Sequence, residues 1–202
     1  MKHSACLDLE GVLIPEIWPW LAHRTGIEGF SKTTRDEPYY SQLMIDRIAL
    51  LSKHGLRLTD VQKFVSEMSP LPGASDFLEW VRQAFKVTLV SDAFVQMVEP
   101  FWRIFGQPTL RCHQLVCDTE GFITHAQYSR SHGKHEVIEE FQAQGQWVLA
   151  VVDAYNDLSM LRRANLGFLY RPSASTAAAA RDVYVADSYD QITEACVKLA
   201  YR

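Results

Sequence analysis

The sequence has little that is characteristic of secreted, membrane or nucleic-acid-binding proteins. Its four cysteines form no Cys-x-x-Cys pair, which argues against a disulfide framework or a zinc site and favours buried thiols in a reducing, cytoplasmic compartment. No apolar run approaches the roughly 18 residues that span a membrane. Asp8 and Glu10 also stand too close to the start for a signal peptide. A net charge of −4 gives no electrostatic footprint for nucleic acid or an anionic membrane.

The composition is that of an ordinary globular protein, since 48% of the residues are hydrophobic and 22% are charged. A length of 202 residues allows one domain, or one domain with a small insertion. The stretch from Cys6 to Leu13 is the most informative. An apolar run that is typical of a buried strand ends there in two carboxylates, Asp8 and Glu10, which are followed by Gly11.

A helical block is predicted from Glu16 to about Met68, because apolar residues recur there at helical spacing and no convincing strand interrupts them. Thr59 is the expected N-cap of its last helix. Prolines mark both ends of the block, at Pro15 and within 70–73. We therefore expect residues 15–70 to form a small helical cap, inserted into a core of residues 1–14 and 71–202. The apolar residues that recur at helical spacing in the cap are Ile17, Trp20, Leu21, Leu43, Ile45, Ile48 and Leu51, with Met44 as a further candidate.

The rest of the chain alternates between helix and strand patterns, which predicts an α/β protein with a mostly parallel, Rossmann-like sheet and helices on both faces. Residues 118–121 form a hairpin turn signature between two of the strands. The expected strands are 4–9, 86–90, 109–117, 122–127, 147–152, 167–170 and 183–186. The expected helices are 74–84, 95–105, 135–144, 158–164, 176–181 and 189–199.

Three of the apolar strands end in polar side chains, and parallel strands bring such ends to one edge of a sheet. These side chains are Asp8 and Glu10, then Ser91 and Asp92, then Asp153, Asn156 and Asp157. Carboxylates gathered at one edge repel one another unless a cation joins them, and their hard oxygens suit Mg²⁺. Lys134, at the start of a helix, is the best candidate for a basic residue beside a phosphoryl group.

In this order, the motifs resemble those of the haloacid dehalogenase-like phosphotransferase superfamily. Asp8-Leu9-Glu10-Gly11-Val12 is similar to its first motif, Ser91 to the second, Lys134 to the third, and the segment 153–160 to the fourth. The Asn-Asp-x-Ser-Met ending is typical of the phosphoserine phosphatase group. The runs 6–12, 15–18 and 33–36 bring the chain closest to bacterial members that are also homoserine phosphotransferases.

The resemblance implies a Mg²⁺-dependent phosphoserine phosphatase in which Asp8 forms an aspartyl-phosphate. It implies that Glu10 acts as the acid and base, and that Ser91 and Lys134 hold the phosphoryl oxygens. Asp8, the backbone carbonyl of Glu10 and Asp153 would be metal ligands, with Asp157 as a further ligand or a support for them. Asp92 and Asn156 would belong to the substrate-binding residues, and Asn156 would help to order the site.

In the cap, the resemblance places Arg47 where it would meet the substrate carboxylate and Glu16 where it would meet the ammonium group. Without the resemblance, Arg47 would be read as a surface residue. Glu16 alone would be explained by the helix dipole, which favours an acid in a first turn.

The sequence departs from the family pattern at Glu10, which is one methylene longer than the usual aspartate, and at Val152 and Ala154. The longer acid is expected to favour transfer of phosphate to an alcohol such as homoserine over hydrolysis. Two alternatives remain open: a phosphatase for another small phosphorylated metabolite, and a catalytically silent ligand-binding protein of the same fold. We expect a monomer or a homodimer that acts on a small-molecule substrate.

Overall fold

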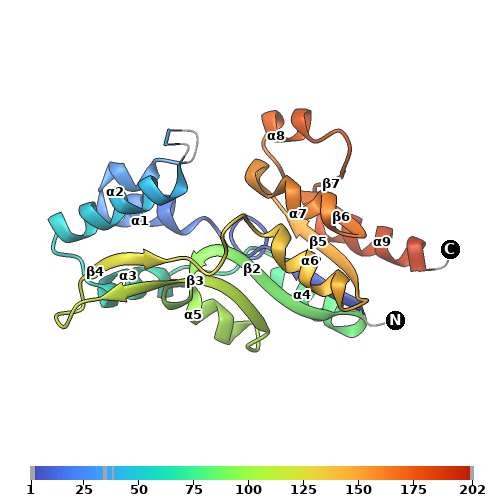
Figure 1. Cartoon of the computed structure of the whole chain (residues 1–202), viewed down its shortest axis with the longest axis horizontal. Coiled ribbons are helices and arrows are strands. Elements are labelled where there is room, and N and C mark those ends of the chain that lie inside the picture. Colours follow the sequence, from blue (N-terminus) through green and yellow to red (C-terminus); the bar gives the residue numbers. More distant parts are fainter. Residues whose placement is uncertain (1–2, 34–35, 38, 201–202) are drawn as a thin grey trace.

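The described residues, 3–33, 36–37 and 39–200 of a computed structural model, build one mostly parallel sheet with helices on both faces (Figure 1). The sheet order is β4-β3-β2-β1-β5-β6-β7, and only β4 runs antiparallel, to β3. The strands are β1 (His3–Leu7), β2 (Lys86–Phe94), β3 (Thr109–Cys117), β4 (Ile123–Gln127), β5 (Trp147–Val152), β6 (Leu166–Tyr170) and β7 (Tyr184–Ala186). This arrangement confirms the predicted fold class.

The helices follow the predicted alternation. Among the described residues, those of the block 15–70 form α1 (Ile17–Thr25), the 3-10 helix η1 (Glu28–Ser31), α2 (Tyr40–Lys53) and α3 (Leu58–Ser66), and no strand. The remaining helices are α4 (Ala74–Ala84), α5 (Val95–Ile104), α6 (His135–Ala143), the 3-10 helix η2 (Tyr155–Asp157), α7 (Leu158–Arg163), α8 (Ala174–Ala179) and α9 (Tyr189–Ala200).

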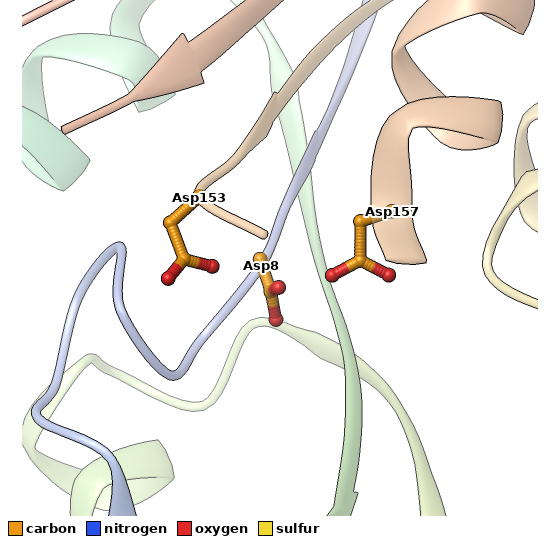
Figure 2. Close-up of side chains that lie close together, drawn as sticks. All are labelled: Asp8, Asp153 and Asp157. Atoms are coloured by element: carbon orange, nitrogen blue, oxygen red, sulfur yellow. The ribbon is translucent and has the colours of Figure 1, made fainter. Parts of the chain in front are cut away.

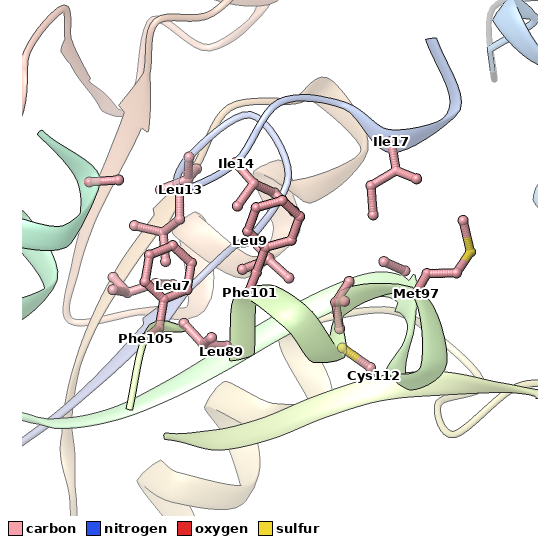
Figure 3. Close-up of a cluster of buried hydrophobic side chains, with 14 of the residues drawn as sticks. Leu7, Leu9, Leu13, Ile14, Ile17, Leu89, Met97, Phe101, Phe105 and Cys112 are labelled. Atoms are coloured by element: carbon pink, nitrogen blue, oxygen red, sulfur yellow. The ribbon is translucent and has the colours of Figure 1, made fainter. Parts of the chain in front are cut away.

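The central strands are buried on both faces, which explains why they are apolar without interruption. Successive side chains of β1 alternate between two apolar clusters. Ala5 and Leu7 belong to the cluster that includes Phe101 of α5, and Cys6 belongs to the cluster that includes Ile138 of α6. Figure 3 shows Leu7 and Phe101 within the first cluster. Each large side chain buried in these clusters contributes roughly 1.5–3 kcal/mol. The packing fixes the ends of β1, β2 and β5 at one edge of the sheet.

The helical block lies over one end of the sheet (Figure 1). Helix α2 packs on β4 and α3 packs on α5, so the block contacts both the hairpin and a helix of the core. Its apolar residues, such as Met44 and Val65, join the same cluster as Leu7. Thr34 and Arg35, within the run 33–36 that contributed to the family resemblance, lie outside the described residues.

Three local predictions were wrong. Ile45 is 58% exposed, whereas the other candidates of α2, Leu43, Met44, Ile48 and Leu51, form its buried face. Thr59 is not an N-cap, since α3 begins at Leu58. The Asp60 carboxylate accepts the backbone N–H of Arg57 there, which satisfies a free donor at the start of the helix.

The third correction concerns β2, which continues past residue 90 to Phe94, so that Ser91 and Asp92 lie within the strand. The pairing of β2 with β3 is irregular between Val90 and Phe94, which breaks the regular ladder at these two residues. No helix of the described residues is long and apolar enough to cross a membrane.

Candidate active site

The chain leaves β1 through a tight turn that holds Asp8 in place. Asp8 donates its backbone N–H to Val151 of β5, and its carboxylate accepts the N–H of Leu9 at 2.7 Å. Gly11 has a φ of +72°, and any Cβ at this position would collide with the Asp153 carboxylate. Glycine at position 11 therefore lets the turn approach Asp153 closely.

Asp8, Asp153 and Asp157 bring their carboxylates together at the edge of the sheet (Figure 2). Asp8 follows β1, Asp153 follows β5, and Asp157 stands at the start of α7; each offers an oxygen within 4.8 Å of the other two. Lys134, next to α6, places its Nζ 2.5 Å from Asp8 Oδ2 and 2.8 Å from Asp157 Oδ2. The predicted convergence of these acids with a basic residue is therefore present.

When its three acids are ionised, the cluster carries more negative charge than Lys134 alone can balance. Burial raises the pKa of Asp8 to about 6, that of Asp153 to about 7 and that of Asp157 to about 8, against the attraction of Lys134. Burial opposes the charge on Lys134, yet Asp157 and Asp8 raise its pKa well above the usual value. A divalent cation would satisfy the remaining charge, and three carboxylates form the oxygen donor set that Mg²⁺ prefers.

Glu10 and Glu16 lie at the junction between the sheet edge and the helical block. Glu10 Oε1 accepts the backbone N–H of Ile17, the first residue of α1, at 2.8 Å. Burial and the nearby Glu16 raise the pKa of Glu10 to about 8, so it holds a proton near neutral pH. Burial also raises the pKa of Glu16. The Glu10 carboxylate does not belong to the cluster of Asp8, Asp153 and Asp157 that could hold a metal ion.

Arg47 is buried, with 6% exposure, and is not the surface residue that its isolated position in the sequence suggested. Its guanidinium donates to the backbone oxygen of Lys32 at 2.7 Å and lies over the Trp18 ring, 4.6 Å from its centroid. Burial lowers the pKa of Arg47. A buried guanidinium held in this way is pre-organised to bind a carboxylate or another anion.

All the predicted site residues line one cleft of about 1260 Å³, between the helical block and the sheet edge. They are Asp8, Glu10, Glu16, Arg47, Ser91, Asp92, Lys134, Asp153, Asn156 and Asp157. Asn156 donates to Asp157 Oδ1 at 3.2 Å, which helps to orient that carboxylate.

Three further residues around Asp92 escaped the sequence analysis: Tyr40, His113 and Arg130. Arg130 donates to Asp92 Oδ1 at 2.7 Å, and the Tyr40 hydroxyl donates to the backbone oxygen of Asp92 at 2.6 Å. Arg130 stands close to Lys134 in a polar segment, which is a weak signal. Nothing in the sequence links Tyr40 to a strand 52 residues away.

Comparison with known proteins identifies the family to which this chain belongs. Residues 5–165 match the family model of haloacid dehalogenase-like hydrolases, and the chain belongs to this family of enzymes. It is 37% identical over 198 residues to a phosphoserine phosphatase from Pseudomonas syringae pv. tomato, covering 98% of this chain and 84% of that one. It is 42% identical over 166 residues to phosphoserine phosphatase ThrH from Pseudomonas aeruginosa, covering 82% and 81% of the two chains.

A solved structure supports the fold. The phosphoserine phosphatase from T. onnurineus, in complex with NDSB-201, superposes with a TM-score of 0.75 at 23% identity, covering 96% of this chain and 94% of that one. The resemblance seen in the sequence motifs is thus confirmed at the level of the family and the fold.

Proposed function

We propose that the protein is a Mg²⁺-dependent phosphatase that hydrolyses O-phosphoserine through an aspartyl-phosphate on Asp8. The observation that carries the proposal is the position of Asp8. It is buried beside Lys134 and two further carboxylates, in a cleft that also receives Arg47 and Glu16 from the helical block. The phosphoserine phosphatases among its relatives support the choice of substrate.

Each step of the proposed hydrolysis is carried out by particular residues of the cleft. An Asp8 oxygen attacks the phosphorus, the bond to the serine oxygen breaks, and Glu10 donates its proton to that oxygen. Glu10, then deprotonated, accepts a proton from the water that attacks the phosphorus and frees Asp8. Lys134 and Ser91 hold phosphoryl oxygens, while Arg47 and Glu16 bind the carboxylate and ammonium groups. The pKa of Glu10, raised to about 8 by burial, suits the first step.

The acidic cluster fits a metal ion by its chemistry, since its carboxylates supply oxygen donors only. Asp8, the backbone carbonyl of Glu10 and Asp153 would hold Mg²⁺, and Asp157 would bind it or support its ligands. When bound, the ion supplies positive charge that offsets the charge of the phosphoryl group.

A panel of phosphomonoesters tests this function. We expect release of phosphate from O-phosphoserine in the presence of Mg²⁺, with higher kcat/KM than for sugar or nucleoside phosphates. Preference for another ester would point to a different small metabolite. Absence of turnover with every ester would favour a silent ligand-binding protein.

Removal of metal should stop turnover, and the stabilisation by Mg²⁺ should depend on pH. The folded protein binds more protons than the unfolded chain between about pH 4 and 8, because Asp8, Asp153 and Asp157 have raised pKa values. Stability without metal should therefore fall as pH rises through this range. Metal binding displaces these protons, so the increase in Tm should be larger near pH 8, on the order of 5–10 °C, than near pH 6.

The measurement is thermal unfolding at both pH values, with EDTA and with saturating Mg²⁺. Asp153→Asn should reduce the increase in Tm, whereas the exposed control Asp182→Asn should not. Zn²⁺ should restore less turnover than Mg²⁺. Full turnover after thorough chelation would contradict the proposed metal dependence.

Arg47→Ala should distinguish esters that carry a carboxylate from those that do not. We expect the KM for O-phosphoserine to rise roughly 10- to 100-fold, because a hydrogen bond to a charged group contributes about 1.5–3 kcal/mol. O-phosphoethanolamine has the ammonium group but no carboxylate, so its KM should change little. Arg24→Ala provides a control on an exposed arginine of α1. Equal losses for both esters would show that Arg47 does not bind the carboxylate.

Glu10 is proposed to favour transfer to an amino-acid alcohol such as homoserine. Its carboxylate is already bound to the N–H of Ile17, which limits its freedom to orient a water molecule. An acceptor held by Arg47 and Glu16 gains from positioning that water lacks. With labelled phosphoserine and homoserine, we expect both phosphohomoserine and free phosphate, and Glu10→Asp should shift the ratio toward free phosphate. An unchanged ratio would refute this role of Glu10.

A further inference from the structure

Two residues of β2, Ser91 and Asp92, are held by contacts from elements far apart in the sequence. Ser91 is 1% exposed, and its Oγ accepts the N–H of Ala93 at 3.1 Å. The regular pairing of β2 with β3 is interrupted here, so the β-ladder alone does not fix the backbone. Other contacts must therefore set the position of Ser91.

The first support comes from Arg130, whose side chain is 6% exposed. One guanidinium nitrogen, Nη2, donates to the backbone oxygen of Ser91 and to Asp92 Oδ1, both at 2.7 Å. The other, Nη1, donates to the backbone oxygen of Arg111 in β3 at 2.9 Å. The planar fork of Arg130 therefore bridges β2 and β3 where their direct pairing is irregular.

The second support comes from the helical block. Tyr40, the first residue of α2, donates its hydroxyl to the backbone oxygen of Asp92 at 2.6 Å. Its ring also contacts the rings of His113 and Tyr128, with centroids 6.4 and 6.1 Å away. The peptide unit between Asp92 and Ala93, whose N–H is bound to Ser91 Oγ, is thus tied directly to the block that lies across the cleft.

These contacts converge on one oxygen of the Asp92 carboxylate, Oδ1. Arg130 binds one of its oxygens, and His113 Nε2 lies 3.5 Å from the same oxygen. Nδ1 of His113 accepts the N–H of Ser129, which leaves the proton on Nε2, facing Asp92. The resemblance implied a role for Asp92 in binding the substrate, but these contacts favour a structural anchor for its neighbour Ser91.

We propose that Arg130 and Tyr40 are positioning residues for phosphate binding, which hold the Ser91–Asp92 segment from the core and from the helical block respectively. The proposal rests on the proposed function in one respect, that Ser91 binds the phosphoryl group. It predicts that the three side chains Arg130, Tyr40 and Asp92 affect every phosphate ester alike. In this respect they differ from Arg47, which affects only esters with a carboxylate.

The test uses the whole protein with Mg²⁺ and inorganic phosphate as the probe. Tyr40→Phe removes only the hydroxyl, so we expect the Kd for phosphate to rise about 3- to 10-fold, as for the loss of one hydrogen bond. The kcat/KM values for O-phosphoserine and O-phosphoethanolamine should fall by the same factor. Asp92→Asn and Arg130→Lys should act in the same direction. Tyr39→Phe is the matched control, because Tyr39 is the adjacent residue and is 75% exposed.

A double-mutant cycle separates positioning of Ser91 from a general effect on folding. If Tyr40 acts through Ser91, Tyr40→Phe should weaken phosphate binding less in a Ser91→Ala background than in the wild type. Fully additive losses would overturn the proposal. A loss confined to O-phosphoserine would also overturn it, because Tyr40 or Asp92 would then recognise the serine moiety.

Failure of the proposed function would look different. A wild type that binds phosphate with the expected variant effects, yet does not hydrolyse phosphoserine, would refute the substrate and leave the positioning role supported. A wild type that binds no phosphate would refute the positioning role itself. Arg130→Lys retains the charge beside Asp92, and Tyr40→Phe and Asp92→Asn keep the test decisive if the arginine variant does not fold.

Discussion

Asp8→Asn should abolish phosphatase activity, with a loss of at least about 10⁴-fold in kcat, because the amide cannot form the covalent intermediate. The fold should persist. An asparagine oxygen can still accept the N–H of Leu9, and the substitution removes a buried acid whose pKa is raised by burial to about 6. Phosphate release measures the loss of activity, and circular dichroism with thermal unfolding measures the fold.

Trapping the intermediate makes the test specific to Asp8. Rapid acid quenching after mixing with labelled phosphoserine should leave label on the wild-type protein and none on the variant. Asp182→Asn is the control, since Asp182 pairs with Arg162 on the surface and is 55% exposed. Ordinary turnover by the Asp8 variant would exclude Asp8 as the nucleophile.

Lys134→Met is expected to reduce both activity and stability. The loss of the cation beside the phosphoryl group should lower kcat by about 10²–10³-fold. Breaking a buried ion pair by removing one partner costs about 3–5 kcal/mol. Lys134 has two such partners, Asp8 and Asp157, and its side chain is only 4% exposed. The free energy of unfolding should therefore fall well beyond the effect of an ordinary surface substitution.

This loss of stability should depend on pH. Without the lysine, the pKa values of Asp8 and Asp157 rise further above those of the unfolded chain, so folding stability falls as pH rises. Urea unfolding in EDTA should show a larger loss near pH 8, where the acids are charged, than near pH 5, where they hold protons. The control is Lys86→Met, at an exposed position of β2. Equal losses at the two pH values would argue against unpaired carboxylates as the cause.

The sequence predicted the features that depend on local pattern and chain order. Uninterrupted apolar runs identified β1 and β5, and the acids that follow them marked the sheet edge because parallel strands all end on one side. The same order of motifs led to Lys134, whose contacts with Asp8 and Asp157 the structure then showed. The mismatch at Ile45 arose because spacing alone does not fix which of several neighbouring residues faces the core.

The features that the sequence did not predict depend on contacts between distant segments. The hydrogen bond from Tyr40 joins residues 52 positions apart, and that from Arg130 to Asp92 joins residues 38 apart. No periodicity or motif connects such pairs, since the sheet order and the docking of α2 bring them together. The extension of β2 through Ser91 was missed because Asp92 is a poor strand former that the bonds from Arg130 and Tyr40 hold in place.

The apolar cluster that runs from the sheet into the helical block limits how freely the block could be exchanged. Val65 and Met44 share this cluster with Leu7 and Phe101, while α2 rests on β4 and α3 rests on α5. A chimera that takes residues 15–70 from a relative would juxtapose surfaces shaped for different neighbours. To recover a well-packed hybrid, the transplanted segment would have to bring along the matching faces of α5 and the β3–β4 hairpin. The block and the elements that support it therefore behave as one packing unit in any exchange between relatives.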